Sequence, residues 1–311
     1  MKTANASKVF VDMNQENRIL FERPDIGRLA DTYTVVDLHF HSKYSDGQNT
    51  IQEIAEYAEA LGIGVAITDH NDIQGAVEIA QYSRIFTIPG IEVTSREGAH
   101  ILFYFYEIKE LRSFYHRDVA PHMGKDIMSS TDLSLEALIQ RANRYSVLSI
   151  FPHPFCGMYT GIASHQLEKQ HLTRLFQLID GIEVINSENL NKWNLKSALL
   201  GFNLNKAISG GSDGHSLSQL GKVVSYADCE PTCKAFLDAI KHKQNKVVGK
   251  ESDILKKVKS NGIKLRTNLK NYPDIVEKNF SYSRKVINIK SRLLRDRVRD
   301  HINGKRKRFE R

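Results

Sequence analysis

Apolar and polar positions in the first part of the chain alternate as expected of strands and helices that follow one another. Residues 33–40 (YTVVDLHF) form an apolar run of strand length, and residues 51–61 carry apolar side chains at the helical spacing of three or four positions. Thr50 and Glu53 match a capping box at the start of that helix. A second apolar run, GVAITDH, begins at Gly64. The order strand, helix, strand predicts a parallel βαβ unit.

The same alternation continues to about residue 212. Further strands are predicted at IFTIPGIEVTS, HILFYFY, VLSIFPHP, GIEVINS and AISGGSDGH, and further helices at about 135–145, 167–179 and 193–200. Six or seven strands therefore lie in this part of the chain, most of them separated by helices. The pattern favours an α/β domain built as a closed or nearly closed barrel, in which catalytic side chains gather where the strands end.

Side chains that can bind a metal are found at these strand ends. His39 and His41 occupy alternate positions, so both imidazoles point to the same side and can chelate one cation. Asp46 follows in the next loop and offers a hard oxygen ligand. Glu92 lies among apolar residues, where an unpaired carboxylate would be costly and a metal would neutralise it. The other candidates are Asp69 and His70 in TDHND, His100 at the head of HILFYFY, His153 in FPHP, and Asp213 and His215 in SDGH.

These motifs occur in a characteristic order. The succession HxHSxxSDG, TDHN, GIE, HP and SDGH resembles the polymerase and histidinol phosphatase (PHP) superfamily over residues 31–250. The resemblance implies a distorted (β/α)7 barrel with a metal site at the C-terminal ends of its strands. It also implies two or three divalent metal ions, for which Mn, Fe and Zn all suit a site of histidines and carboxylates.

The resemblance also assigns ligands, position by position. It implies three overlapping groups: His39 and His41 with Glu92 and Asp213; Glu92 with His100 and His153; and Asp46, His70 and His215.

A metal-dependent phosphoesterase is the activity that this site implies. Paired metals can clamp phosphate oxygens and activate water, so we expect a metal-bridging hydroxide to attack the phosphorus of a phosphomonoester or phosphodiester. The expected substrate is a small organic phosphate such as a nucleotide, or an oligonucleotide end. Asp69, or His215 if it is not a ligand, is the candidate for proton transfer. Lys43 and Arg96 lie near the metal motifs and are candidates for binding substrate phosphate, although both could be plain surface residues.

Two alternatives remain open at this point. One is a histidinol-phosphatase-like enzyme of the same superfamily. The other is a non-catalytic, metal-bearing scaffold that binds nucleic acid or a polymerase through a basic tail. Metal-dependent turnover would separate an enzyme from a scaffold.

Charge changes the picture at the C-terminus. Residues 251–311 hold 19 Lys and Arg against 7 Asp and Glu, whereas the whole chain has 44 against 36, so the rest is slightly acidic. The expected organisation is an N-terminal extension (residues 1–30), the barrel (31–250) and a basic, helical tail (251–311). Such a tail could contact nucleic acid or an anionic surface.

The remaining composition points to an intracellular protein. No apolar run is long enough for a secretory signal or a transmembrane segment, which predicts a cytoplasmic location. Cys156, Cys229 and Cys233 are odd in number and suggest ordinary reduced thiols.

Overall fold

The computed structural model describes residues 18–251 except 158, 159 and 166. The strands are β1 (Ile19–Leu20), β2 (Thr34–Phe40), β3 (Gly64–Ile67), β4 (Gly90–Thr94), β5 (His100–Phe105), β6 (Val147–Phe151), β7 (Gly181–Asn186), β8 (Ala207–Gly211), β9 (Val223–Ala227) and β10 (Lys246–Gly249). The α-helices are α1 (Ile26–Ala30), α2 (Ile51–Leu61), α3 (Gln74–Ile79), α4 (Ile108–Phe114), α5 (Leu135–Ala142), α6 (Lys169–Leu178), α7 (Asn191–Asn203) and α8 (Cys233–Lys241).

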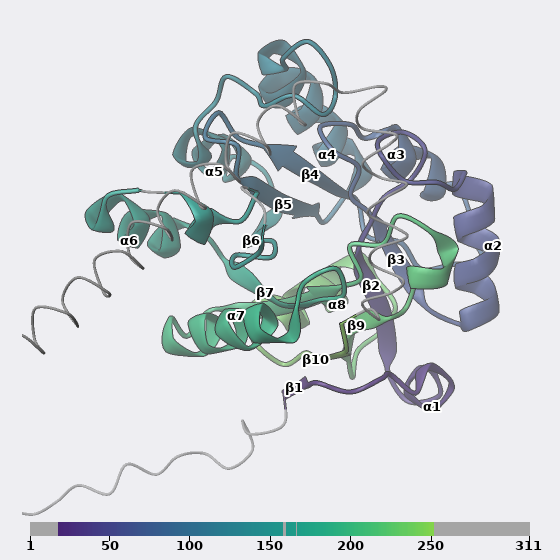
Figure 1. Ribbon diagram of the computed structural model, residues 1–311. Helices are drawn as coiled ribbons and strands as arrows, with labels where there is room; N and C mark the ends of the chain where they lie inside the picture. Colours follow the sequence, from purple (N-terminus) through teal and green to yellow (C-terminus); the bar gives the residue numbers. More distant parts are fainter. Residues whose placement is uncertain (1–17, 158–159, 166, 252–311) are drawn as a thin grey trace, which may run out of the picture.

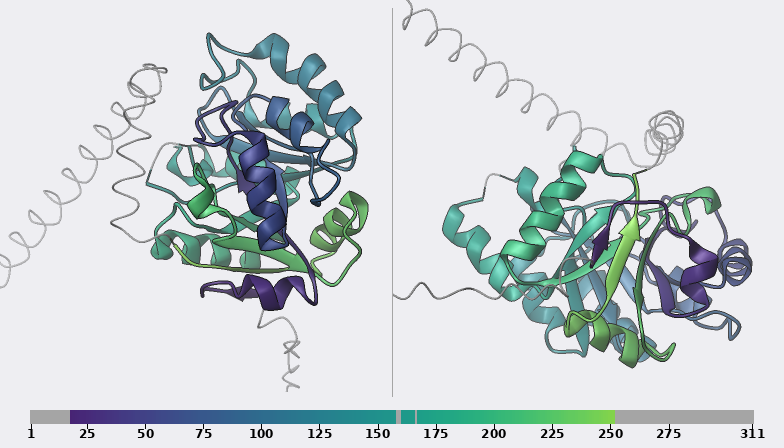
Figure 2. Two further views of the ribbon diagram at one scale, coloured as in Figure 1. Left: turned by 90° about the vertical axis from the view of Figure 1, so that its right-hand side faces the viewer. Right: turned by 90° about the horizontal axis from the view of Figure 1, so that it is seen from below.

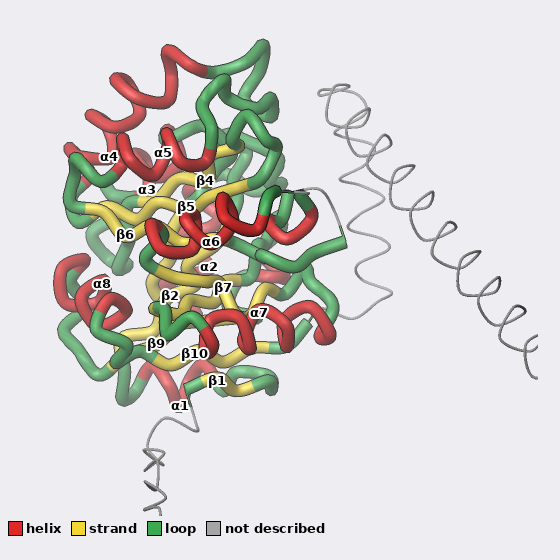
Figure 3. The backbone as a smooth tube through the Cα atoms, turned by 90° about the vertical axis from the view of Figure 1, so that its left-hand side faces the viewer, coloured by secondary structure: helices red, strands yellow, loops and turns green. Residues whose placement is uncertain are grey.

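The strands form two five-stranded sheets surrounded by helices (Figures 1 and 3). The first sheet has the order β1-β10-β9-β2-β3, and the second has the order β4-β5-β6-β7-β8. Two further views show α2 and α7 on different sides of the strands (Figure 2). The fold is therefore a mixed α/β architecture, as the sequence predicts.

The two sheets approach each other at two places. Isolated bridges join Val65 to Thr87 and His70 to Glu92 near the neighbouring edge strands β3 and β4, and another joins Phe40, at the end of β2, to Gly214, after β8. Because a continuous ladder does not run around the described strands, the closed or nearly closed barrel stays a prediction. Both junctions nevertheless bring strand ends from the two sheets to the same place.

Strand direction differs from the predicted parallel pattern in the second sheet. β5 pairs antiparallel with both β4 and β6, while β2–β3, β6–β7 and β7–β8 are parallel. Only residues 95–99 separate β4 from β5, which is too short for the crossover that a parallel pair requires. The antiparallel register places His100, the first residue of β5, opposite Thr94, the last residue of β4. A strand start thus lies among the strand ends.

Local capping agrees with the sequence at α2. The Thr50 side chain accepts a hydrogen bond from the Glu53 amide, and Glu53 accepts one from the Thr50 amide. Gly62 ends the helix in the left-handed conformation. The other three predicted helices correspond to α5, α6 and α7 with slightly different ends.

Both predicted terminal regions lie partly outside the described residues. From Arg18 onward, the N-terminal region supplies β1, which pairs with β10, and the short helix α1. Residues 252–311, and with them the expected tail helix, lie outside the described part of the chain. Among the helices of the described residues, none has the length and apolar character needed to span a membrane.

Candidate metal centre

The end of β2 supplies the first two histidines of the candidate centre. His39 and His41 are buried, and both reach the same carboxylate: their Nε2 atoms lie 3.5 and 3.1 Å from Oδ1 of Asp213. Alternate positions on a strand point to one face, which explains the shared partner. His39, His41 and Asp213 offer ligand atoms close enough to hold one ion.

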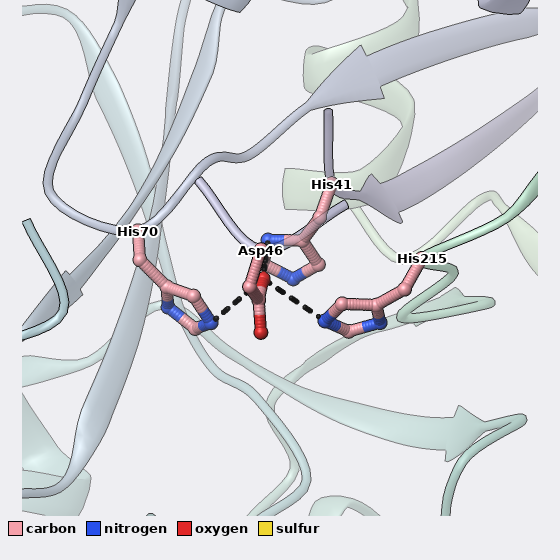
Figure 4. A group of neighbouring side chains, drawn as sticks. All are labelled: His41, Asp46, His70 and His215. Carbon is pink, nitrogen blue, oxygen red and sulfur yellow. Dashed lines mark ion pairs between the residues drawn. The ribbon is translucent and has the colours of Figure 1, made fainter. Parts of the chain in front are cut away.

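A second group forms around Asp46, in the loop between β2 and α2. Its Oδ1 lies 3.7 Å from Nδ1 of His41, 3.6 Å from Nε2 of His70 and 3.1 Å from Nε2 of His215 (Figure 4). All four side chains are buried. The group joins residues that are far apart in the sequence, and His41 belongs to this group as well as to the first.

Glu92, in the middle of β4, is the centre of the third group. Its Oε1 lies 3.0 Å from Nδ1 of His100 and 3.3 Å from Nε2 of His153, and its Oε2 lies 2.9 Å from Nδ1 of His70. Glu92 also lies 3.5 Å from His39. This carboxylate is therefore within reach of residues from all three groups, as a bridging ligand must be.

Two of these residues have unusual backbone conformations. His153 and Asp213 have φ values of 30° and 51°, in the left-handed region that non-glycine residues rarely adopt. Such strain is concentrated at functional sites, where the surrounding structure enforces it. Here it aims both side chains at the same cluster.

The buried histidines of the cluster differ in the direction in which their pKa values are shifted. Burial lowers the pKa of His41 to about 3 and that of His100 to about 4, helped by neighbouring imidazoles. For His39, burial acts in the same direction, but the carboxylates of Asp213 and Glu183 outweigh it and hold the pKa well above its ordinary value. His41 and His100 are thus neutral at pH 7, which is the form that binds metals.

The donor set fits divalent cations. Nε2 of His39 and Nδ1 of His41 are buried and have no hydrogen bond among the described residues. Buried polar atoms are normally hydrogen-bonded, so atoms that lack such a partner and converge on one place call for a ligand. Mixed nitrogen and oxygen donors suit Mn, Fe and Zn.

All nine residues predicted as metal ligands therefore lie in one buried cluster. The grouping differs slightly from the predicted one, because His41 also faces Asp46 and His70 also faces Glu92.

The other predicted residues are placed differently. Asp69 is buried and accepts hydrogen bonds from the Ser42 amide, the Ser42 hydroxyl and the Ser45 hydroxyl. Its carboxylate thus holds the loop that carries Asp46, and burial raises its pKa to about 6. Lys43 and Arg96 are exposed, and they lie in the loops that follow β2 and β4.

Sequence reasoning missed Glu183, on β7. Its Oε1 lies 3.0 Å from Nδ1 of His39, and its Oε2 accepts hydrogen bonds from the His153 amide and the Asn186 side chain. Asn186 also donates to Asp213. The signal was present, because Glu183 stands in the same tetrapeptide, GIEV, that drew attention to Glu92. An acidic residue inside a buried strand needs partners in both cases.

Comparison with known proteins gives a match to one family and matches to two proteins. The PHP domain family matches residues 37–187. The uncharacterized protein MJ1587 of Methanocaldococcus jannaschii is 31% identical over 164 residues, which cover 49% of this chain and 81% of that protein. An error-prone DNA polymerase of Symbiobacterium thermophilum is 32% identical over 97 residues, which are 29% of this chain and 9% of the polymerase.

Solved structures show the same fold at low sequence identity. A Bacteroides vulgatus two-domain protein, described as containing a PHP-like metal-dependent phosphoesterase, has a TM-score of 0.51 at 19% identity, over 76% of this chain and 69% of that one. The lesion-specific endonuclease Q of Pyrococcus furiosus has a TM-score of 0.58 at 20% identity, over 70% of this chain and 58% of that one.

Proposed function

Because the chain belongs to the PHP domain family, we propose that it is a metal-dependent phosphoesterase. The proposed reaction is hydrolysis of a phosphomonoester or phosphodiester in a small organic phosphate, such as a nucleotide, or at an oligonucleotide end. The proposal includes the nine metal ligands, a (β/α)7 barrel as the closed form of the two sheets, and the division into an N-terminal extension, a barrel and a basic tail.

One observation carries the proposal. Six imidazoles and three carboxylates converge in one cluster. Eight of these nine side chains form three overlapping groups whose ligand atoms are close enough to hold ions, and the ninth, His153, lies 3.3 Å from Glu92. A scaffold that had lost catalysis would not need to keep three adjacent groups at the cost of burying so many polar atoms. The complete donor set therefore favours an enzyme over a scaffold.

The proposed ligands fall into the three groups described above, and Glu92 lies within reach of residues from each group. Two or three divalent cations held there would neutralise phosphate oxygens and lower the pKa of water toward neutrality. Mn, Fe and Zn all remain proposed metals, because selectivity at such sites depends on metal availability as well as on ligand type.

The chain's own residues supply positioning. Glu183 accepts from Nδ1 of His39, which fixes the tautomer that directs Nε2 into the cluster. Nδ1 of His215 donates to the Asp213 carbonyl and leaves its Nε2 toward Asp46. The three hydrogen bonds to Asp69 support a role in holding the Ser42–Ser45 loop. Proton transfer stays assigned to Asp69, or to His215 if His215 is not a metal ligand. Lys43 and Arg96 remain the proposed contacts to substrate phosphate.

Phosphate release, for phosphomonoesters, and strand cleavage, for phosphodiesters, test the proposal. The full chain, purified without chelator, is assayed against nucleotides, short oligonucleotides and histidinol phosphate, before and after chelation and after metal is restored. We expect turnover of at least one nucleotide or oligonucleotide, lost on chelation and regained with Mn, Fe or Zn. Preference for histidinol phosphate would favour the histidinol-phosphatase-like alternative, and bound metal without any turnover would favour the scaffold.

A matched pair of variants ties the activity to the cluster. Asp213→Asn should lower kcat/KM by about 100-fold or more, because several kcal/mol of transition-state stabilisation depend on the metals. Asp228→Asn, at an exposed aspartate after β9, should leave kcat/KM unchanged. Full activity in Asp213→Asn with metal bound would contradict the proposed site.

A further inference from the structure

We propose that Phe155, Trp193, Lys192 and Lys196 form a binding surface for single-stranded nucleic acid beside the metal centre. This inference rests on the proposed phosphoesterase function and narrows its substrate to an oligonucleotide strand. The four residues are called the aromatic-lysine surface below.

The aromatic-lysine surface is connected to the metal centre by short segments. Phe155 follows His153 by two residues, and its carbonyl accepts a hydrogen bond of 2.9 Å from the Asn189 side chain. The Asn189 amide in turn donates to the Asn186 carbonyl, and the Asn186 side chain donates to Asp213. The loops after β6 and β7 are therefore joined at the end of the strands where the metal ligands lie.

Trp193 is held against the loop that carries Phe155. A Cβ added at Gly157 would lie 2.5 Å from Cη2 of Trp193, so the indole ring packs directly on the glycine backbone. Phe155 and Trp193 both remain partly exposed. Large aromatic side chains fixed at a surface are the groups on which unpaired bases stack.

Two cations accompany the aromatic rings. Nζ of Lys196 lies 5.8 Å from the centre of the Phe155 ring, and Nζ of Lys192 lies 5.2 Å from that of the Trp193 ring. Both lysines are exposed, and neither has a carboxylate partner among the described residues. The nearby carboxylate of Glu251 accepts from the Asn191 amide at the start of α7.

The combination of aromatic rings and lysines favours single-stranded nucleic acid as the ligand. Aromatic faces accept bases of any sequence, and lysines spaced along a helix can follow the phosphates of a flexible strand. A duplex keeps its bases stacked inside and can offer only its phosphates to the lysines. A strand bound here would lie beside the metal cluster, where one of its phosphates could be cleaved.

The test uses metal-free full-length protein, so that binding is measured without turnover. Trp193 is the only tryptophan in the chain, so its emission reports directly on this surface. A short oligodeoxythymidylate should quench the emission and bind more tightly than a thymidine nucleotide or a duplex of equal length.

Variants measured with a labelled oligonucleotide separate stacking from charge. Trp193→Ala should raise Kd by about 5- to 150-fold, with Trp193→Phe recovering part of the loss. Lys192→Ala combined with Lys196→Ala should raise Kd and reduce the slope of log K against log salt by about 1.4. The matched control is Lys234→Ala with Lys241→Ala on α8, which should leave both quantities unchanged.

Several outcomes would overturn the inference. They are the absence of quenching, equal affinity for the nucleotide or the duplex, loss of affinity in the α8 control, and an emission change with anionic vesicles but not with the oligonucleotide. Metal-dependent turnover of small phosphate esters together with any of these would leave the proposed function in place. Quenching without turnover of any phosphate ester would instead remove the proposed function.

Discussion

The imidazole of His39 has its two nitrogens engaged in different directions. Nδ1 faces Glu183 at 3.0 Å, and Nε2 faces Asp213 and Glu92 at 3.5 Å each. A carboxylate behind a metal-binding histidine sets its tautomer and raises its basicity. At the scale of single residues, Glu183 is thus the strongest candidate for tuning the centre without binding a metal.

Glu183→Gln tests this role. The amide keeps the shape and one acceptor oxygen but removes the charge, so metal affinity should fall by about 10- to 100-fold while the fold is kept. Metal titration of the chelated protein measures the affinity, and circular dichroism checks the fold. The exposed Glu230→Gln should bind metal as the unmodified chain does, and equal affinity in both variants would remove Glu183 from the centre.

Metal binding should release protons. The pKa of His39 is held above its ordinary value by the carboxylates around it, so at neutral pH the metal-free ring is protonated, and a cation must displace that proton. Affinity should therefore rise with pH through the neutral range, whereas His41 and His100, already neutral, add nothing. Calorimetry in buffers of different ionisation enthalpy measures the release; heats independent of buffer would contradict it.

At the scale of elements, α3 packs closely against the end of β3 and against Asp69, which follows it. A Cβ on Gly75, in the first turn of α3, would lie 2.3 Å from Oδ2 of Asp69 and 2.8 Å from Cγ2 of Ile67. Asp69 in turn holds the loop that carries Asp46. The missing side chain at Gly75 thus makes room for the carboxylate that positions a metal ligand.

Gly75→Ala should lower the free energy of unfolding by about 1–3 kcal/mol, as overpacking of a filled interior usually does, and should weaken metal binding as well. Gly27→Ala in α1 is the matched control, because nothing lies within 4 Å of the added Cβ. It should leave metal affinity unchanged and keep or slightly increase stability. Urea denaturation compares the two; equal effects would show that Asp69 is not tightly packed by α3.

The sequence predicted elements well where a local signal was complete. The capping box at Thr50 and the helical spacing over residues 51–61 predict α2, and the structure confirms it. The parallel pattern was wrong for β5, because residues 95–99 contain no helix and are too few for the crossover that a parallel pair requires. Whether the two sheets amount to a barrel depends on contacts at their edges, which no local pattern encodes.

For the candidate site, the sequence named residues that the structure brings together, and their role as metal ligands stays a prediction. Its residues are marked by chemistry that is rare in buried strands, namely histidines and carboxylates beside apolar runs, and the structure brings these residues together. What the sequence could not supply is the sharing of His41 and His70 between groups, because that depends on side-chain directions. Glu183 was missed although it stands in the same tetrapeptide, GIEV, as Glu92.

At the scale of the whole molecule, the centre lies where the two sheets meet. The predicted ligands come from β2 in one sheet, from β4 and β5 in the other, and from the loops that follow β2, β3, β6 and β8. Cations held there would connect the two sheets as well as act on substrate. Stability and metal content should therefore be linked.

Chelation should lower the melting temperature of the full chain. A ligand that binds only the folded state, present at about 100 times its Kd, adds about 2.7 kcal/mol to the free energy of unfolding. Thermal unfolding with and without a chelator measures the loss, and His41→Ala should show a smaller difference between the two conditions. Identical melting temperatures for the unmodified chain would mean that metals do not link the sheets.

Metal stoichiometry is the most direct test of the central claim, that the buried histidines and carboxylates hold the cations of a phosphoesterase. The full chain, purified without chelator and supplied in turn with Mn, Fe and Zn, is analysed by mass spectrometry of its metals against protein concentration. We expect two to three ions per chain, reduced in His41→Ala, whose ring faces two of the three groups. A chain that retains no divalent metal under any of these conditions would contradict the account.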